Sequence, residues 1–156
     1  MGPFCDQKEE DWDRDIALNL KGAMICIQAV LPGMLERRYG KVINISSGVA
    51  KHGAPNFEAY AACKAGIGGL TKSLALARAT SGINVNCIAP GFVKTNFGVG
   101  SLPADNWQET VERAVPQKRA TAPEEIASMA AFLASDVSAS VLGQMYSVDG
   151  GFTMTS

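Results

Sequence analysis

Histidine is nearly absent from the sequence, and the cysteines form no closely spaced pair. The single histidine, His52, has no cluster of ligand-type residues near it in the sequence, so the spacing of a metal site is missing. The four cysteines, Cys5, Cys26, Cys63 and Cys87, could form two disulfides, but such bonds are typical of smaller, loop-rich secreted chains. We therefore expect no metal, and reduced thiols in a cytoplasmic protein.

Three further absences exclude other classes of protein. The net charge is −1 and the basic residues are scattered, without the basic stripe of a nucleic-acid-binding protein. The sequence has no uninterrupted run of about 18 apolar residues, so no membrane span is predicted. The acidic residues 1–15 lack the apolar core of a secretory signal. With 47% hydrophobic and 19% charged residues, we expect one globular domain over residues 1–156, without a nucleic-acid or membrane partner.

Hydrophobic periodicity and turn residues divide the chain into alternating helices and strands. Asp6 and Glu9 fit a capping box, so the first helix is predicted to begin near Gln7. Apolar residues at three- and four-residue spacings continue it, with a bend near 19–22, until Gly40. The pattern then predicts strands at 41–47, 83–88 and 144–148, a loop at 48–57, and helices at 58–80, 104–114 and from 121–124 onward. This alternation predicts an α/β fold with a parallel sheet.

The apolar character of the strand at residues 42–45 indicates that the sheet has a further strand that this chain does not supply. The strand is apolar nearly throughout, which is typical of a strand that is buried on both faces and paired on both sides. The residues before it supply only a helix, and an open apolar strand edge promotes aggregation. We expect the chain to be a fragment, or another chain to complete its sheet.

Tyr60 and Lys64 form the first candidate catalytic pair. They lie four residues apart near the start of the helix at 58–80, so their side chains share one face. An unperturbed tyrosine, with a pKa of about 10, is a poor base near neutral pH. A neighbouring cation favours the phenolate and lowers that pKa, so the pair is a plausible acid/base.

Other polar residues are predicted to lie near this pair. Ser47 ends the strand at 41–47, and residues 90–95 follow the next strand. Open α/β proteins bind ligands at this carboxyl edge of the sheet. There the Ser47 hydroxyl could bind a substrate oxygen, and Thr95 with neighbouring backbone amides could bind a ligand. Asn19, at the expected helix bend, could bind water.

The sequence resembles the short-chain dehydrogenase/reductase family in six stretches that occur in the family's order and spacing. They are residues 19–22 (NLKG), 42–47 (VINISS), 60–66 (YAACKAG), 84–91 (NVNCIAPG), 123–127 (PEEIA) and 148–151 (VDGG). The resemblance covers nearly the whole chain. It implies a three-layer Rossmann-like parallel sheet, truncated to the last three strands and their helices, and an oxidoreductase that uses NAD or NADP.

The same resemblance implies a role for each matching residue. Tyr60 would exchange a proton with the substrate oxygen, and Lys64 would lower the pKa of Tyr60 and hold the nicotinamide ribose. Ser47, with Ser46 as the alternative, would orient the substrate oxygen, and Asn19 would bind a water that links Lys64 to solvent. The set implied to bind the cofactor is Tyr60, Lys64, Pro90, Gly91, Val93 and Thr95.

The resemblance also implies a substrate lid and surfaces for subunit contacts. Residues 97–115 correspond to a substrate lid, and the helices near 8–38 and 58–80 correspond to those that form a homodimer or homotetramer. The small residues of the second helix, among them Gly66 and Gly68, agree with close helix packing, because an interior glycine costs about 1 kcal/mol relative to alanine. Met145, Phe152 and Met154 are expected at a subunit contact.

The sequence departs from the family in its first part. The family's glycine-rich turn, its selector for the adenosine ribose and its Asn-Asn-Ala-Gly stretch are missing. The nearest candidates, Gly66-Ile67-Gly68 and Gly98-Val99-Gly100, lack a third glycine and a preceding strand. With no helix N-terminus to bind the pyrophosphate, we expect the chain alone to bind the cofactor weakly or not at all.

Two functions follow as hypotheses. In the first, the chain is part of an oxidoreductase for secondary alcohols or ketones, in which oxoacyl reductases and hydroxyacyl or cyclic-alcohol dehydrogenases are the suggested types. In the second, it is an inactive, truncated partner that associates with full-length relatives through its long helices. A serine hydrolase that uses Ser47 and His52 is a poor third, because the G-x-S-x-G turn is missing.

Overall fold

The computed structural model describes residues 2–96 and 106–154 and has a parallel sheet at its centre. Within these residues the strands are β1 (Gly40–Ile45), β2 (Ile83–Pro90) and β3 (Met145–Val148), paired in the order β1-β2-β3. Both pairings are parallel, which confirms the predicted α/β fold. Among the described strands, β1 has a neighbour on one side only.

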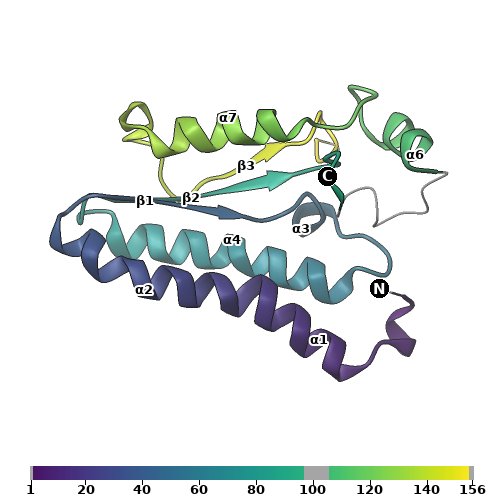
Figure 1. Cartoon of the computed structure of the whole chain (residues 1–156), viewed down its shortest axis with the longest axis horizontal. Helices are drawn as coiled ribbons and strands as arrows, with labels where there is room; N and C mark the ends of the chain where they lie inside the picture. Colours follow the sequence, from purple (N-terminus) through teal and green to yellow (C-terminus); the bar gives the residue numbers. More distant parts are fainter. Residues whose placement is uncertain (1, 97–105, 155–156) are drawn as a thin grey trace.

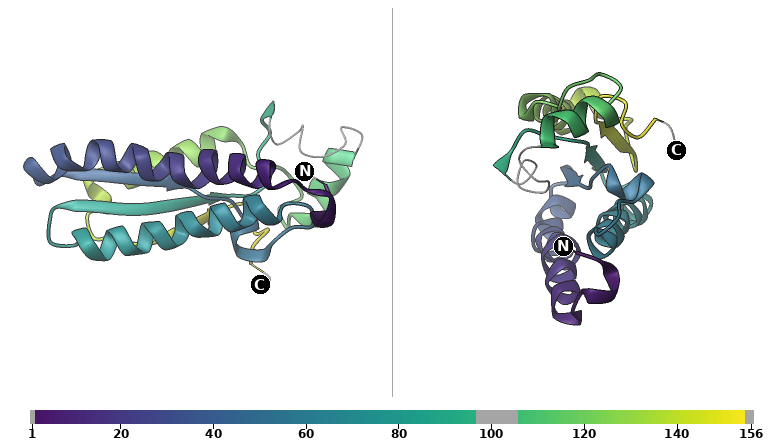
Figure 2. Two further views of the ribbon diagram at one scale, coloured as in Figure 1. Left: turned by 90° about the horizontal axis from the view of Figure 1, so that it is seen from below. Right: turned by 90° about the vertical axis from the view of Figure 1, so that its right-hand side faces the viewer.

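Helices cover both faces of this sheet and form three layers with it (Figures 1 and 2). The N-terminal helical stretch and α4 lie on one face, and α7 lies on the other. The helical segments are η1 (Phe4–Asp6), α1 (Glu9–Ile16), η2 (Ala17–Lys21), α2 (Gly22–Glu36), α3 (Val49–His52), α4 (Glu58–Arg78), α6 (Trp107–Ala114), α7 (Pro123–Ala134) and η4 (Asp136–Ser138). As predicted, Pro123 occupies the first turn of α7.

The main apolar core lies between the sheet and the helices α2 and α4. Val42 of β1 and Val85 of β2 are buried there together with Ile27 of α2 and Ala75 of α4. Their burial follows from the apolar character of both strands and from the inward stripe of each helix. The core therefore holds the two long helices against the strands whose ends bear the candidate site.

The boundaries of the first helix differ from those predicted. Asp6 ends the short η1 turn, and α1 begins at Glu9 without a side-chain cap, so the capping-box prediction was wrong. The Asp6 backbone N–H is already bonded to the Pro3 carbonyl in that turn. At the other end α2 stops at Glu36, because Arg38 takes a positive φ of 51°. Gly40 begins β1 and does not end the helix.

Two local features also refine the predictions. The expected irregularity near Asn19 is a π-helical turn, η2, between α1 and α2, and such turns often occur at functional sites. The segment predicted as a loop contains the short helix α3, which ends at Gly53, where φ is 73°. A positive φ costs glycine little, so Gly53 can turn the chain toward α4.

The stretch Glu9–Glu36 is long and apolar enough to cross a membrane by length and composition. The expectation of no membrane span considered only uninterrupted apolar runs, and charged residues interrupt this stretch, among them Lys21 near its middle. Such a stretch is weak evidence for a span, because one side of it packs on α4 and β1. The other side leaves large apolar residues exposed, including Ile16, Leu18 and Ile25.

A buried hydrogen bond joins the sheet to α4. The Asn44 side-chain amide on β1 donates to the Thr71 hydroxyl on α4 over 2.9 Å, and both residues are buried. A buried amide that loses its partner retains the full cost of desolvation. This bond therefore favours one position of α4 along β1 over others.

We predict that Thr71→Val lowers the free energy of unfolding by about 1–3 kcal/mol, because the Asn44 amide would be buried without its acceptor. Urea denaturation monitored by circular dichroism measures the change. Ser73→Ala, on the exposed side of the same helix, is the control and should change stability by less than about 0.5 kcal/mol. Equal stability of Thr71→Val and the parent protein would contradict the role of this bond.

Candidate active site

The candidate site lies at the end of the molecule where the carboxyl ends of the strands meet the first turn of α4 (Figure 1). A cavity of about 580 Å³ opens there. Seven of the eight residues predicted from the sequence line it: Ser47, Tyr60, Lys64, Pro90, Gly91, Val93 and Thr95. Parallel strands bring these segments together, because all their carboxyl ends lie at one edge of the sheet.

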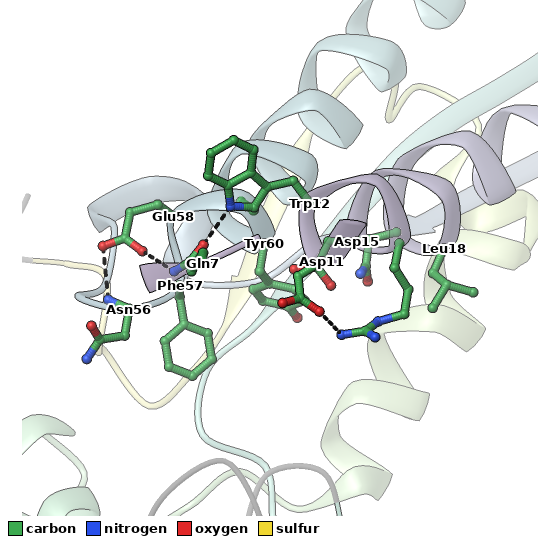
Figure 3. A pocket seen from close by; sticks show the side chains of 12 residues that line it. Gln7, Asp11, Trp12, Asp15, Leu18, Asn56, Phe57, Glu58 and Tyr60 are labelled. Atoms are coloured by element: carbon green, nitrogen blue, oxygen red, sulfur yellow. Dashed lines mark hydrogen bonds and ion pairs between the residues drawn. The ribbon is translucent and has the colours of Figure 1, made fainter. Parts of the chain in front are cut away.

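Asn19 is the predicted site residue that does not line this cavity. It lines a second cavity of about 450 Å³, between the N-terminal helix and the start of α4 (Figure 3). Tyr60 belongs to the walls of both cavities. The structure therefore places Asn19 at a cavity that Ser47 does not line, and its role in a proton relay stays a prediction.

Two hydrogen bonds join the end of β1 to α4 close to the site. The Ser46 hydroxyl donates to the Lys64 carbonyl over 2.7 Å, and the Lys64 ammonium donates to the Ile45 carbonyl over 3.1 Å. Ser46 is buried and its hydroxyl is engaged in this contact. This geometry favours Ser47 over Ser46 as the residue that could reach a substrate.

The acidity of Tyr60 differs from the expectation. Burial is the largest effect and raises the pKa of Tyr60, a hydrogen bond with the Ser47 side chain lowers it, and the Asp15 charge raises it. The net direction is opposite to the lowering expected from Lys64, whose ammonium lies 5.5 Å from the Tyr60 ring centroid. Burial disfavours the charged form of each group, and it also lowers the pKa of Lys64.

One wall of the cavity is a row of aromatic rings, of which only Trp107 is a pocket candidate from the sequence. Phe152 contacts His52 edge to face at 4.3 Å and Phe92 at 4.9 Å between ring centroids. Phe92 in turn contacts Trp107 of α6 at 5.5 Å. Phe152 therefore lines the site, and its expected place at a subunit contact stays a prediction. His52 is exposed, as expected, yet it also lines the cavity.

A turn after β3 positions Phe152. The buried Asp149 carboxylate accepts hydrogen bonds from the Gly151 amide at 2.9 Å and from both the amide and the hydroxyl of Thr153, at 2.9 and 2.6 Å. These bonds close a turn over residues 149–153. A β-carbon on Gly91 would lie 2.6 Å from that of Asp149, so glycine permits this close approach. The repeated glycines signalled the turn, but nothing in the sequence signalled where it packs.

The predicted lid is described in part. Residues 97–105, which include the candidate pocket residues Phe97 and Leu102, lie outside the described residues. In the remaining part, Trp107 is buried with Val111 and Val115 against Phe92 and Phe152. The α6 end of the lid region thus packs on the aromatic wall.

Within the described ranges, no group of three or more histidine, cysteine, aspartate or glutamate residues could hold a metal ion. All four cysteines are free; Cys63 and Cys87 are buried, and Cys5 and Cys26 are exposed. The pKa of Cys63 is raised, chiefly by burial, which agrees with a packing residue and not with a nucleophile.

Known dehydrogenases and reductases match nearly the whole chain. A family model described as enoyl-(acyl carrier protein) reductase matches residues 1–153. The curated 3-oxoacyl-(acyl-carrier-protein) reductase FabG of Thermotoga maritima is 44% identical over 147 residues, which are 94% of this chain and 59% of that protein. Most of the described chain therefore has a counterpart in a dehydrogenase or reductase.

Solved structures give the same result. A gluconate 5-dehydrogenase from Burkholderia cenocepacia J2315 in complex with NADP and tartrate matches with a TM-score of 0.95 at 32% identity, over 99% of this chain and 61% of that one. A 3-oxoacyl-(acyl-carrier protein) reductase from Brucella melitensis with bound NAD matches with a TM-score of 0.89 at 34% identity, over 99% and 56%. The chain belongs to the short-chain dehydrogenase/reductase family, and it spans about 60% of the length of the curated relatives it matches.

We predict that Ser47→Ala raises the pKa of Tyr60 further, because the hydrogen bond from Ser47 favours the phenolate. The ultraviolet absorbance of tyrosinate would report this ionisation in a protein that also carries Tyr39→Phe and Tyr146→Phe, which leave Tyr60 as the only tyrosine. Ser46→Ala is the control, since that hydroxyl donates to a backbone carbonyl. A Tyr60 midpoint that moves with Ser46→Ala and not with Ser47→Ala would reverse the assignment.

Proposed function

We propose that this chain is the catalytic part of an NAD(P)-dependent oxidoreductase that interconverts a secondary alcohol and a ketone. The observation that carries the proposal is the meeting of Ser47, Tyr60 and Lys64 at one cavity, with Ser47 hydrogen-bonded to Tyr60. A hydroxyl and a phenol at one cavity wall can both reach a single substrate oxygen. This arrangement suits proton transfer at that oxygen during reduction or oxidation of the attached carbon.

Each side chain would have a distinct task. In reduction, Tyr60 donates its proton to the ketone oxygen while Ser47 donates a hydrogen bond that holds this oxygen in place. In oxidation, the same phenolic oxygen accepts the proton of the alcohol. A tyrosine with an ordinary pKa of about 10 is neutral near neutral pH, and burial, which raises the pKa of Tyr60, reinforces this proton-donating form. Lys64, which is anchored to the Ile45 carbonyl, presents a cation beside the ring.

The residues after β2 fit the nicotinamide end of the cofactor. Pro90, Gly91, Val93 and Thr95 line the cavity next to Tyr60, and Gly91 keeps that wall free of a side chain. A bound nicotinamide would supply or accept the hydride at the substrate carbon. Bound NADP in one related structure and bound NAD in another support either form of the cofactor. We infer that the open edge of β1 receives the segment that binds the phosphates.

The aromatic wall and the relatives together indicate the substrate class. Phe92, Phe152 and Trp107 present apolar surface to the cavity, which suits an acyl chain or a cyclic ketone. One relative is named as a 3-oxoacyl-(acyl-carrier-protein) reductase. We therefore propose oxoacyl reduction, or oxidation of a hydroxyacyl or cyclic alcohol, as the reaction type.

We predict that Tyr60→Phe lowers kcat by roughly 10²–10⁴-fold, the usual contribution of a general acid or base. The measurement requires a protein that contains this chain together with a glycine-rich cofactor-binding segment, and follows nicotinamide absorbance with an oxoacyl or cyclic ketone substrate. Cofactor affinity should be retained.

Tyr146→Phe is the control for that experiment, because Tyr146 lies on β3 away from the walls of the cavity. Its turnover should match that of the parent protein. Retention of turnover by Tyr60→Phe would remove the phenol from the proposed role, whereas loss of turnover in both variants would point to a structural effect.

We infer that the chain associates with further copies through the predicted helices near 8–38 and 58–80, as a homodimer or homotetramer. Large apolar side chains are exposed on these helices, with Leu18 70%, Ile25 55% and Leu76 82% exposed. A β-carbon on Gly69 would meet nothing within 4 Å, so this part of α4 is open to close approach. Several large apolar side chains exposed on neighbouring helices are a feature of interaction sites.

We predict that Leu76→Glu weakens self-association, because a charge would then be buried in the helix face. Sedimentation velocity over a range of concentrations would show a shift toward the monomer. Val137→Glu is a matched control, since Val137 is 85% exposed but lies in η4, away from these helices. Equal association of both variants would argue against this face.

We also propose a cytoplasmic location. All four cysteines are free thiols, and two of them are exposed. Exposed thiols persist most readily in a reducing compartment. Detection of this protein in a cytosolic fraction would test the proposal directly.

A further inference from the structure

Charged residues of α1 line the second cavity together with Tyr60 (Figure 3). Asp11, Asp15 and Asn19 line it and are spaced four residues apart, so they lie on one side of the helix. This side faces the start of α4, against which α1 packs. Because Tyr60 also lines the substrate cavity, charges in the second cavity can act on the phenol without contacting the substrate.

The carboxylates in this cavity differ in how well they are neutralised. Asp11 forms an ion pair with Arg14 at 2.7 Å. The Glu58 carboxylate accepts two hydrogen bonds, at 3.0 and 3.2 Å. Within residues 2–96 and 106–154, Asp15 has neither an ion-pair partner nor a hydrogen bond, and it is partly buried. Its negative charge is therefore the one in this cavity that nothing in the described chain offsets.

We propose that Asp15 is a positioning residue whose charge holds the Tyr60 phenol in its neutral, proton-donating form and so favours ketone reduction over alcohol oxidation. This inference rests on the proposed function. An anion beside a phenol disfavours the phenolate. In reduction the neutral phenol supplies the proton, whereas in oxidation the phenolate must be present to accept it. A fixed negative charge near Tyr60 therefore moves the pH profile of alcohol oxidation to higher pH.

The electrostatics of the neighbouring groups support this assignment. The Asp15 charge raises the pKa of Tyr60 and also that of Cys63, so its influence extends to α4. The titratable and charged groups that face Tyr60 are Asp11, Arg14 and Asp15 on α1, Glu58, Cys63 and Lys64 on α4, and His52 on α3. Ser47 acts in the opposite direction to Asp15 and from the other cavity.

The test is to titrate Tyr60 in the chain itself, with Tyr39→Phe and Tyr146→Phe as the background and tyrosinate absorbance as the signal. Asp15→Asn, which has nearly the same shape, should lower the midpoint of Tyr60 ionisation, and Asp15→Glu should restore it. Asp13→Asn is the matched control: it removes the same charge from the same helix at an exposed position that does not line the cavity. Circular dichroism at each pH shows which points belong to the folded protein.

A midpoint that is the same in Asp15→Asn and Asp13→Asn would overturn the inference. A second measurement covers the case in which the protein unfolds before Tyr60 ionises. In the protein that also carries the cofactor-binding segment, Asp15→Asn should shift the pH profile of oxidation to lower pH, whereas the profile of Asp13→Asn should match that of the parent protein. Coincident profiles of the two variants would overturn the inference. Turnover by Tyr60→Phe decides the proposed function separately, so the two failures are distinguishable.

Discussion

The attachment of α4 to the end of β1 is the contact on which the site depends. A buried bond between Asn44 and Thr71 sets the position of the helix along the strand. Two further bonds, from Ser46 to the Lys64 carbonyl and from the Lys64 ammonium to the Ile45 carbonyl, join the strand end to the helix. Since a helix is rigid over its first turns, these bonds also determine where Tyr60 lies relative to the strand. The loop that follows β1 then needs only to present Ser47 at the cavity wall.

Tyr60 lies between two environments that act on its acidity in opposite directions. On the substrate side, the Ser47 hydroxyl favours the phenolate, and on the other side Asp15 opposes it. Burial, the largest effect, keeps the phenol neutral. The net direction is a raised pKa, which favours the neutral form of the phenol over the phenolate. Lys64, whose charge was expected to lower the pKa of Tyr60, is placed by its bond to a backbone carbonyl and is itself partly desolvated.

Two surfaces of the described chain remain open, and both bear on function. The outer edge of β1 has no neighbour among the described strands, and the outer face of α1, α2 and α4 exposes large apolar residues such as Leu18 and Leu76. In native proteins, unpaired strand edges and exposed apolar faces are usually covered by further elements or by a partner molecule. The related FabG protein is longer, with the match covering 59% of it. This difference agrees with the proposal that a phosphate-binding segment adjoins β1 and that the helices contact another copy.

Much of the fold and part of the site follow from local sequence alone. The alternation of apolar strands and long helices predicts the parallel sheet, and helical spacing places Tyr60 and Lys64 on one face. A strand end places Ser47 beside them. The packing between distant segments decided the rest: Asn19 lines a different cavity from Ser47, and Phe152, from the far end of the chain, completes the aromatic wall of the cavity that Ser47 lines. Burial and through-space charge set the acidity of Tyr60, and both depend on which side chains from other elements lie nearby, which spacing along one segment does not reveal.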